Sequence, residues 1–166
     1  KDFTSSELTE LYDIIGLGAL KFYLLRVDPK KKMIFNPEES IDIHGYTGPF
    51  IQYTHARIKS ILRKEQPDGS AEYLKETLLP LEKSLLVSIE QFPVIIQQSA
   101  LEHNPSTLAN YIYHLAKTFN SFYSEHSISK AETEGKKALR LRIAVMTANT
   151  IQSGMHLLGI NVPEKM

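Results

Sequence analysis

Apolar residues recur along most of the chain at spacings of three and four, which is the period of one face of an α-helix. The first helix is predicted to open at Thr4, which stands in capping-box register with Glu7, and to end near Arg26. No segment of useful length alternates between apolar and polar residues as a half-buried strand would. The pattern therefore predicts an all-α fold: a helical bundle preceded by a helix and a turn-rich connector.

The connector is predicted between residues 28 and 49, where proline and glycine turn signals interrupt the helical spacing. Two short apolar pieces, 33–35 and 41–43, leave a small hairpin as an alternative. A helix is predicted to start after Pro49 and to be stopped by the turn residues 66–70. On this helix we expect His55, Lys59 and Arg63 to point outward on one stripe.

The second half of the chain reads as three further helical stretches. The first runs from 71 to 103, where Pro80 and Pro93 should each break or kink it, because proline lacks an amide donor. The second follows Pro105, and the third runs from about 131 to 158 and closes at Gly159. Near the N-terminus, residues 16–18 (Gly-Leu-Gly) predict close helix packing, because a dinucleotide loop needs a third glycine and a preceding strand.

Composition agrees with one soluble domain that can build a core without metal or disulfide support. The chain has 166 residues, 42% of them hydrophobic, and no cysteine. The lack of cysteine excludes a disulfide framework, a thiolate zinc site and a cysteine nucleophile, and the cytoplasm is the expected location. No apolar run is long enough to span a bilayer, and no signal peptide is recognisable. Because the chain opens at Lys1, we expect it to be a piece of a longer protein.

Charge is balanced overall, with 19 basic and 19 acidic side chains, but it is segregated along the chain. One basic cluster lies within residues 55–64 and a second within residues 136–142. Each cluster alone is most simply a solvated helix face, whereas the two together are compatible with a phosphate-binding surface.

Candidate chemistry is confined to binding. The six histidines do not stand at metal-ligand spacing, and nucleophile-elbow, phosphate-loop and kinase motifs are absent, so no active site and no metal site is predicted. Beyond Pro105, one helix face combines Tyr113, Lys117, Asn120 and Tyr123, which supply rings for stacking, a cation for phosphate and an amide for a base edge. Spacing alone leaves Tyr123 open to either a core or an RNA-binding role.

Three stretches of sequence, at the start of the second helix region and in the C-terminal half, resemble the arginyl-tRNA synthetase family. The block at residues 28–58 includes Gly-Tyr-Thr-Gly-Pro-Phe-Ile-Gln-Tyr-Thr-His-Ala-Arg-Ile, and it is similar to the family's passage from the catalytic domain into the anticodon-binding domain. Residues 108–116 and the ending 154–166 look like the family's C-terminal domain. Between them, residues 137–140 read Lys-Ala-Leu-Arg where the domain class has Asp-Ala-Leu-Arg, so Lys137 departs from the signature.

The resemblance implies a C-terminal fragment of an arginine–tRNA ligase, with residues 1–49 as the tail of the catalytic region and 50–166 as the anticodon-binding bundle. The catalytic motifs His-Ile-Gly-His and Lys-Met-Ser-Lys are absent, so the fragment should be inactive. Implied partners are the anticodon loop of an arginine tRNA and the upstream catalytic domain of the same polypeptide, with no membrane partner and a monomeric state. The fragment needs no cofactor, whereas ATP and magnesium are expected in the full-length enzyme.

The resemblance assigns anticodon contacts to Tyr123 and Met166, which we expect to share one pocket. Asn120, Arg140 and Arg142 are added from their position and chemistry. The full predicted set of tRNA-binding residues comprises Tyr123, Met166, Asn120, Lys117, Tyr113, Arg140, Arg142, His55, Lys59 and Arg63. The alternative function is a helical protein–protein interaction domain whose charged faces only keep it soluble.

Overall fold

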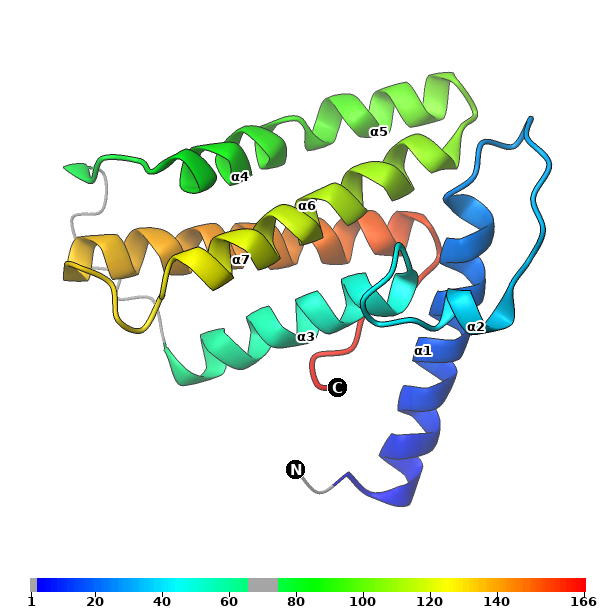
Figure 1. Ribbon diagram of the computed structural model, residues 1–166, viewed down its shortest axis with the longest axis horizontal. Coiled ribbons are helices and arrows are strands. Elements are labelled where there is room, and N and C mark those ends of the chain that lie inside the picture. Colours follow the sequence, from blue (N-terminus) through cyan, green and yellow to red (C-terminus); the bar gives the residue numbers. More distant parts are fainter. Residues whose placement is uncertain (1–2, 66–74) are drawn as a thin grey trace.

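The structure is a computed structural model that describes residues 3–65 and 75–166. Within these ranges the chain forms helices and no strands (Figure 1). The all-α prediction is confirmed, whereas the predicted stop at residues 66–70 lies outside the described residues. In chain order the helices are α1 (Ser5–Leu25), α2 (Pro37–Ser40), α3 (Gly48–Lys64), α4 (Pro80–Glu90), α5 (Phe92–Leu101), α6 (Pro105–Glu125) and α7 (Glu134–Leu157).

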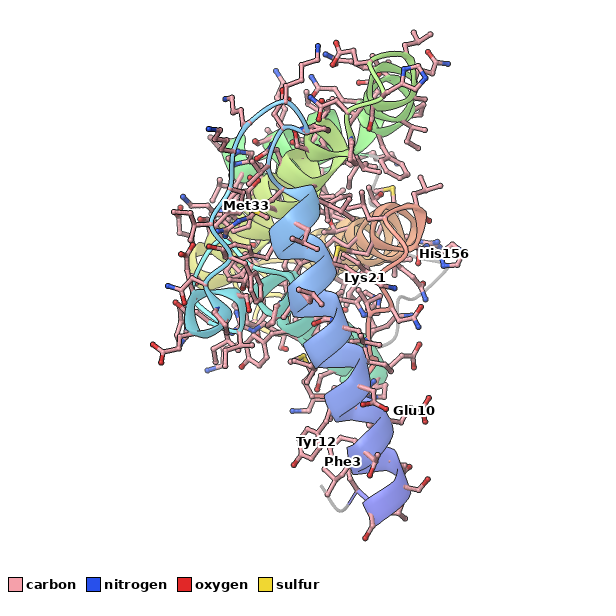
Figure 2. The ribbon with its side chains drawn as sticks, turned by 90° about the vertical axis from the view of Figure 1, so that its right-hand side faces the viewer. Phe3, Glu10, Tyr12, Lys21, Met33 and His156 are labelled. Carbon is pink, nitrogen blue, oxygen red and sulfur yellow. The ribbon has the colours of Figure 1, made fainter. Side chains whose placement is uncertain are left out.

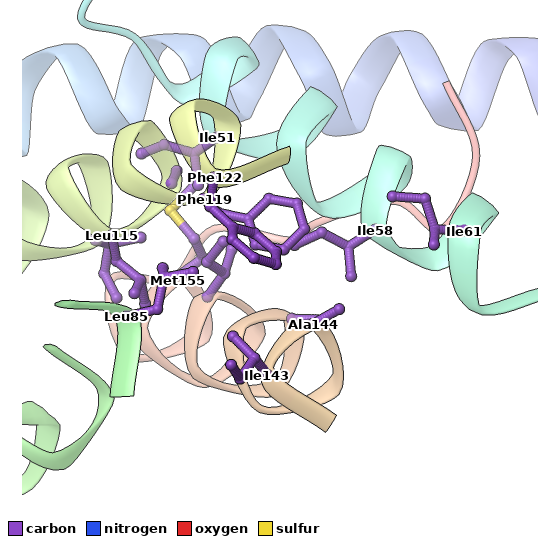
Figure 3. Packing of buried hydrophobic residues seen from close by; sticks show 14 of the residues in the cluster. Ile51, Ile58, Ile61, Leu85, Leu115, Phe119, Phe122, Ile143, Ala144 and Met155 are labelled. Carbon is purple, nitrogen blue, oxygen red and sulfur yellow. The ribbon is translucent and has the colours of Figure 1, made fainter. Parts of the chain in front are cut away.

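The core lies where α3, α6 and α7 pack against one another, with α4 against α6 and α7 (Figures 1 and 3). Helix α6 buries the apolar face that its spacing predicts, including Phe119 and Phe122, which are fully buried. Helix α7 ends as predicted at Gly159, whose φ of 70° favours glycine because a Cβ is strained there. These three helices therefore fix the relative positions of the side chains on the outer faces of α3 and α6.

Helix α1 crosses α3 at a close contact, and its N-terminal half extends beyond the bundle (Figures 1 and 2). The contact depends on two glycines. A Cβ on Gly18 would lie 2.4 Å from Nε2 of Gln52, and a Cβ on Gly48 would lie 2.6 Å from the carbonyl oxygen of Gly18. The prediction of close helix packing is confirmed for Gly18, whereas a Cβ on Gly16 would meet nothing within 4 Å.

The hairpin alternative for the connector is wrong, because the connector contains the short helix α2 and no strand in its described residues. Asn36 caps α2 by accepting hydrogen bonds from the Glu38 and Glu39 amides. In the piece 33–35, Ile34 is 90% exposed and Phe35 packs edge-on against Tyr23 of α1, so its packed residue meets a helix and not a second strand. The connector is instead fastened by Arg26, which bonds Glu39 at 2.6 Å and also donates to the carbonyl of Tyr46.

Pro80 and Pro93, which were predicted to interrupt the helical stretch from 71 to 103, both lie at the start of a helix. Pro80 opens α4, where its missing amide costs nothing, and residues 75–79 before it are not α-helical, in contrast to the predicted helix from 71. Pro93 is in the first turn of α5, directly after the break at Gln91. The predicted interruptions are therefore confirmed. Within the described ranges, no helix is long and apolar enough to cross a membrane.

Candidate nucleic-acid interface

Helices α3 and α6 together place an arginine between two aromatic rings. The Arg57 guanidinium lies 4.8 Å from the ring centroid of Tyr53 on its own helix and 6.0 Å from that of Tyr123 on α6. Tyr53 is one helical turn before Arg57, so the two side chains lie on the same face of α3. Within the described part of the chain, Arg57 has no carboxylate partner, so its charge remains available for an anion.

Asn120 holds this arginine in place. Its Oδ1 accepts a hydrogen bond of 2.8 Å from Arg57, while its Nδ2 donates at 2.8 Å to the Thr54 hydroxyl. Both ends of the Asn120 amide are therefore bonded inside the protein. The amide that the sequence suggested for a base edge instead orients a cation, because α3 passes close enough to α6 for the two side chains to meet.

Tyr123 occupies an intermediate position between core and surface. Its ring stacks on the buried ring of Phe119, with centroids 6.3 Å apart and an angle of 9° between the planes. The residue nevertheless remains 37% exposed, and Tyr53 is 38% exposed. Tyr123 is thus supported from the core side while its own surface stays accessible, which suits a ring that stacks on an external base.

A pocket of about 180 Å³ adjoins Arg57. Its lining residues are Tyr53, Ala56, Arg57, Ser60 and Met166. Met166 therefore lines a pocket, but Tyr123, with which it was expected to share one, is not part of its lining. The two residues assigned by resemblance both lie near Arg57, but they do not line one pocket together.

Met166 reaches this pocket at the end of the C-terminal segment (residues 160–166), which docks on α3. Ile160 is buried, and Val162 packs against the core. The Gln52 amide donates to the carbonyl oxygen of Asn161 at 2.8 Å. The segment is consequently anchored by both apolar and polar contacts before it reaches the pocket.

His55, Lys59 and Arg63 contact the C-terminal segment. The expectation that His55 points outward is wrong, since it is fully buried with Nδ1 2.9 Å from the carbonyl oxygen of Pro163. Lys59 forms an ion pair of 3.2 Å with Glu164, and the exposed Arg63 donates to the Glu164 carbonyl oxygen. Helical spacing could not reveal this because the segment that covers α3 lies about a hundred residues further along the chain.

Lys117 and Tyr113 differ in accessibility. Lys117 is exposed on α6, as a phosphate-binding cation would be. Tyr113 is half-buried, with its ring centroid 4.3 Å from that of Tyr46 and 5.2 Å from that of Phe50. Tyr113 thus joins an aromatic cluster that connects α6 with the start of α3.

The second basic cluster is largely neutralised by carboxylates. Arg140 is 1% exposed and donates to Glu82 at 2.9 Å and to Glu132 at 3.0 Å. The expectation that Arg140 is a surface contact for RNA is therefore wrong. Lys136 also reaches Glu82, at 2.6 Å. Buried charges are stable only when paired, so this cluster supports the packing of α7 on α4.

Hydrogen bonding sets the ionisation of this buried cluster. Burial alone would raise the pKa of Glu82, but hydrogen bonds from the Leu79 amide, Lys136 and Arg140 outweigh it and hold the pKa below its usual value. Burial also disfavours charge on Arg140, yet its bonds to Glu82 raise the pKa of the guanidinium. Both groups therefore stay charged at neutral pH.

The remaining members of the second cluster are more accessible. Lys137, at the position where the signature has aspartate, forms an ion pair of 2.7 Å with Glu65 at the end of α3, and this bond raises the pKa of Lys137. Arg142 is exposed on α7 and already takes part in an interaction within the protein. No group of three metal-ligating side chains occurs in residues 3–65 and 75–166.

Sequence reasoning omitted Arg57 and Tyr53 from the predicted site. Arg57 was visible as a member of the first basic cluster, and Tyr53 precedes it by four residues. That spacing of an aromatic residue and an arginine on one helix was the available signal. Their pairing with Asn120 and Tyr123 depends on the packing of α3 against α6, which no local pattern encodes.

Known proteins are similar to this chain in both sequence and fold. The DALR anticodon binding domain family matches residues 51–166. The arginine–tRNA ligase of Flavobacterium psychrophilum is 51% identical over 166 residues, which cover 100% of this chain and 28% of that ligase. The ligase of Bacteroides fragilis is 43% identical over 167 residues, which cover 98% of this chain and 28% of that protein.

Solved structures agree with the sequence relatives. The arginyl-tRNA synthetase of Thermus thermophilus has a TM-score of 0.90 and 33% identity, covering 99% of this chain and 28% of that one. The synthetase of Plasmodium falciparum has a TM-score of 0.82 and 25% identity, covering 96% and 28%. The chain thus spans 28% of the length of these relatives, and the resemblance noted in the sequence is confirmed. With well over half of its residues matched, the chain belongs to the DALR anticodon-binding domain family.

Proposed function

We propose that the surface formed by α3, α6 and the C-terminal segment binds the anticodon loop of an arginine tRNA. On this proposal the chain is the C-terminal, tRNA-binding part of an arginine–tRNA ligase. The observation that carries the proposal is the environment of Arg57. Among the described residues this cation has no carboxylate partner, and Asn120 holds it near the partly exposed rings of Tyr53 and Tyr123. Unpaired RNA bases are recognised by such combinations of stacking rings and cations.

Each residue of this surface has a distinct role in the proposal. Tyr123 provides a ring for an unpaired base, backed by Phe119. Arg57 binds a phosphate or a base edge, since its planar guanidinium offers several donors in a fixed geometry. Met166 and Tyr53 receive an apolar base surface in the pocket beside it. Lys117 contributes positive charge on the exposed side of α6.

The activity of the longer polypeptide follows from the same proposal. Relatives that this chain matches are arginine–tRNA ligases, of which it spans 28%. In such a polypeptide the remaining portion would activate arginine with ATP and magnesium, while this chain holds the tRNA. We therefore expect the chain alone to show no arginine-dependent exchange of pyrophosphate into ATP and no charging of tRNA, because phosphoryl transfer requires groups that position the phosphates.

The test is a shift assay with the isolated chain and two transcripts, an arginine tRNA and the same tRNA with a different anticodon. Preference for the first transcript is expected. Its affinity should also fall with salt at a log-log slope of roughly −2 to −4, as for about three to five phosphate contacts. Equal binding of both transcripts would contradict anticodon recognition. A flat salt response would favour the protein-interaction alternative, which nothing in the family match supports.

A further inference from the structure

His55 and Gln52 are fully buried polar anchors of the C-terminal segment, and His55 is the one that contacts it at Pro163, nearer to Met166. The ring is fully buried, and its Nδ1 lies 2.9 Å from the carbonyl oxygen of Pro163. Pro163 stands three residues before Met166, which lines the pocket beside Arg57. The Lys59 and Arg63 contacts to the same segment reach solvent, where such pairs contribute little. Beyond Asn161, which Gln52 holds, the buried polar contact of the segment is thus the one that His55 makes.

The hydrogen-bond geometry fixes the tautomer of the neutral ring. A carbonyl oxygen only accepts, so Nδ1 carries the proton and donates it, which leaves Nε2 of the neutral ring as an acceptor. Among the described residues, the buried Nε2 has no hydrogen-bond partner. A second proton would therefore create a buried positive charge with an N–H that no described acceptor satisfies, which is costly in a core.

We propose that His55 is a positioning residue for the Met166 pocket and that its neutral ring keeps the C-terminal segment docked, so that protonation releases the segment. The inference rests on the proposed function for its consequence in RNA binding. Its first part, the docking of the segment, concerns this chain alone.

The expected direction with pH follows from linkage. Burial lowers the pKa of the docked His55 below 6.5, and the charge of Lys59 on α3 lowers it further. The bond to Pro163 and the charge of Glu164 in the segment act in the opposite direction and are smaller than the burial effect. A released ring returns towards 6.5 and binds the proton first. Docking is therefore fully present above about pH 6.5 and weakens as the pH falls below it.

The docking is tested with a fluorophore on Lys165→Cys, because the chain has no other cysteine and Lys165 is exposed. Between about pH 7.5 and 5.5 the anisotropy of the label should fall, while circular dichroism shows an intact bundle. In His55→Asn the anisotropy should stay constant, because an amide donates to Pro163 without titrating. His156→Asn, which removes an exposed histidine, should keep the response of the parent.

An anisotropy of the parent that does not change with pH would overturn the proposal. A pH response of His55→Asn equal to that of the parent would also overturn it. If that variant does not fold, the test is a pH titration of the unmodified chain by nuclear magnetic resonance. The amide chemical shifts of residues 162–166 should then change over the same pH range as those of the His55 ring. Shifts that follow an exposed histidine instead would overturn the proposal.

The RNA part has a separate readout. Affinity for arginine tRNA should fall in the parent relative to His55→Asn by up to about tenfold per pH unit below 6.5, the limit for one linked proton. A chain that releases its segment with pH but binds no tRNA at any pH would contradict the proposed function and support the docking role of His55. Equal pH profiles of tRNA affinity in the two proteins would overturn the link to the pocket.

Discussion

The two basic clusters of this chain have similar compositions and different environments. In the cluster on α7, Arg140 is buried and bonded to two glutamates, so its charge is neutralised inside the protein. In the cluster on α3, Arg57 is half-buried and bonded to the neutral amide of Asn120. A positive residue within such a run therefore indicates an anion-binding surface only when the fold leaves that residue without a carboxylate partner.

The largest effect is expected for Arg140→Ala. Removing Arg140 leaves the buried negative charge of Glu82 only partly neutralised, so the free energy of unfolding should fall by about 3–5 kcal/mol. Urea unfolding measures this loss, and affinity for tRNA below the transition should match that of the parent. If Arg140→Ala unfolded normally and instead weakened tRNA binding, the contrast between the two clusters would be lost.

The next effect concerns Tyr123. Tyr123→Ala should weaken binding of arginine tRNA by about 1–3 kcal/mol, which is roughly five- to a hundred-fold, because a base loses its stacking partner. Tyr123→Phe keeps the ring and should retain most of the affinity. A binding titration and a thermal melt of each variant separate the roles. An early melt with normal binding below the transition would assign Tyr123 to the core.

Arg57→Ala and Lys137→Ala form a matched pair, with one cation removed from each cluster. If Arg57 binds a phosphate, its removal should reduce the magnitude of the log-log salt slope of tRNA binding by about 1. Lys137 is already paired with Glu65, so its removal should leave the slope unchanged. Titrations at several salt concentrations measure both slopes. Identical slopes for the two variants would mean that the clusters do not differ in their access to RNA.

The smallest effect is the stability change in Lys137→Ala. Its pair with Glu65 is accessible to solvent, and such pairs contribute little to folding. The midpoint of thermal unfolding should stay within about 2 °C of the parent at this chain length. A large drop in this midpoint would show that Lys137, like Arg140, belongs to the structural part of the cluster.

Helix positions and core faces could be predicted because they depend on local spacing. Phe119 and Phe122 repeat with the other apolar residues of α6, and both are fully buried. Gly159 ends α7 as predicted, since its positive φ is a local requirement. Such features need no knowledge of what packs against the helix.

The candidate site depended on contacts between distant segments. His55 was expected outside because nothing on its own helix indicates that Pro163 lies over it. Arg140 was expected at the surface because Glu82 is 58 residues away in sequence. For Tyr123 spacing left a core and an RNA-binding role open, and the residue is 37% exposed while its ring stacks on Phe119. The partners that determine whether a charge is available are thus set by tertiary packing, which spacing does not encode.

The contact between Gly18 and Gly48 has a mechanical consequence. Helix α1 has 21 residues, which at 1.5 Å per residue makes a rod roughly 30 Å long. Where it crosses α3, backbone meets backbone without a side chain between them, so there is little compressible material at the crossing. A small change in tilt at this point would move the projecting N-terminal end through a much larger arc. The crossing is thus a pivot, and the missing Cβ of Gly48, which would lie 2.6 Å from the Gly18 carbonyl oxygen, sets how closely the two helices approach there.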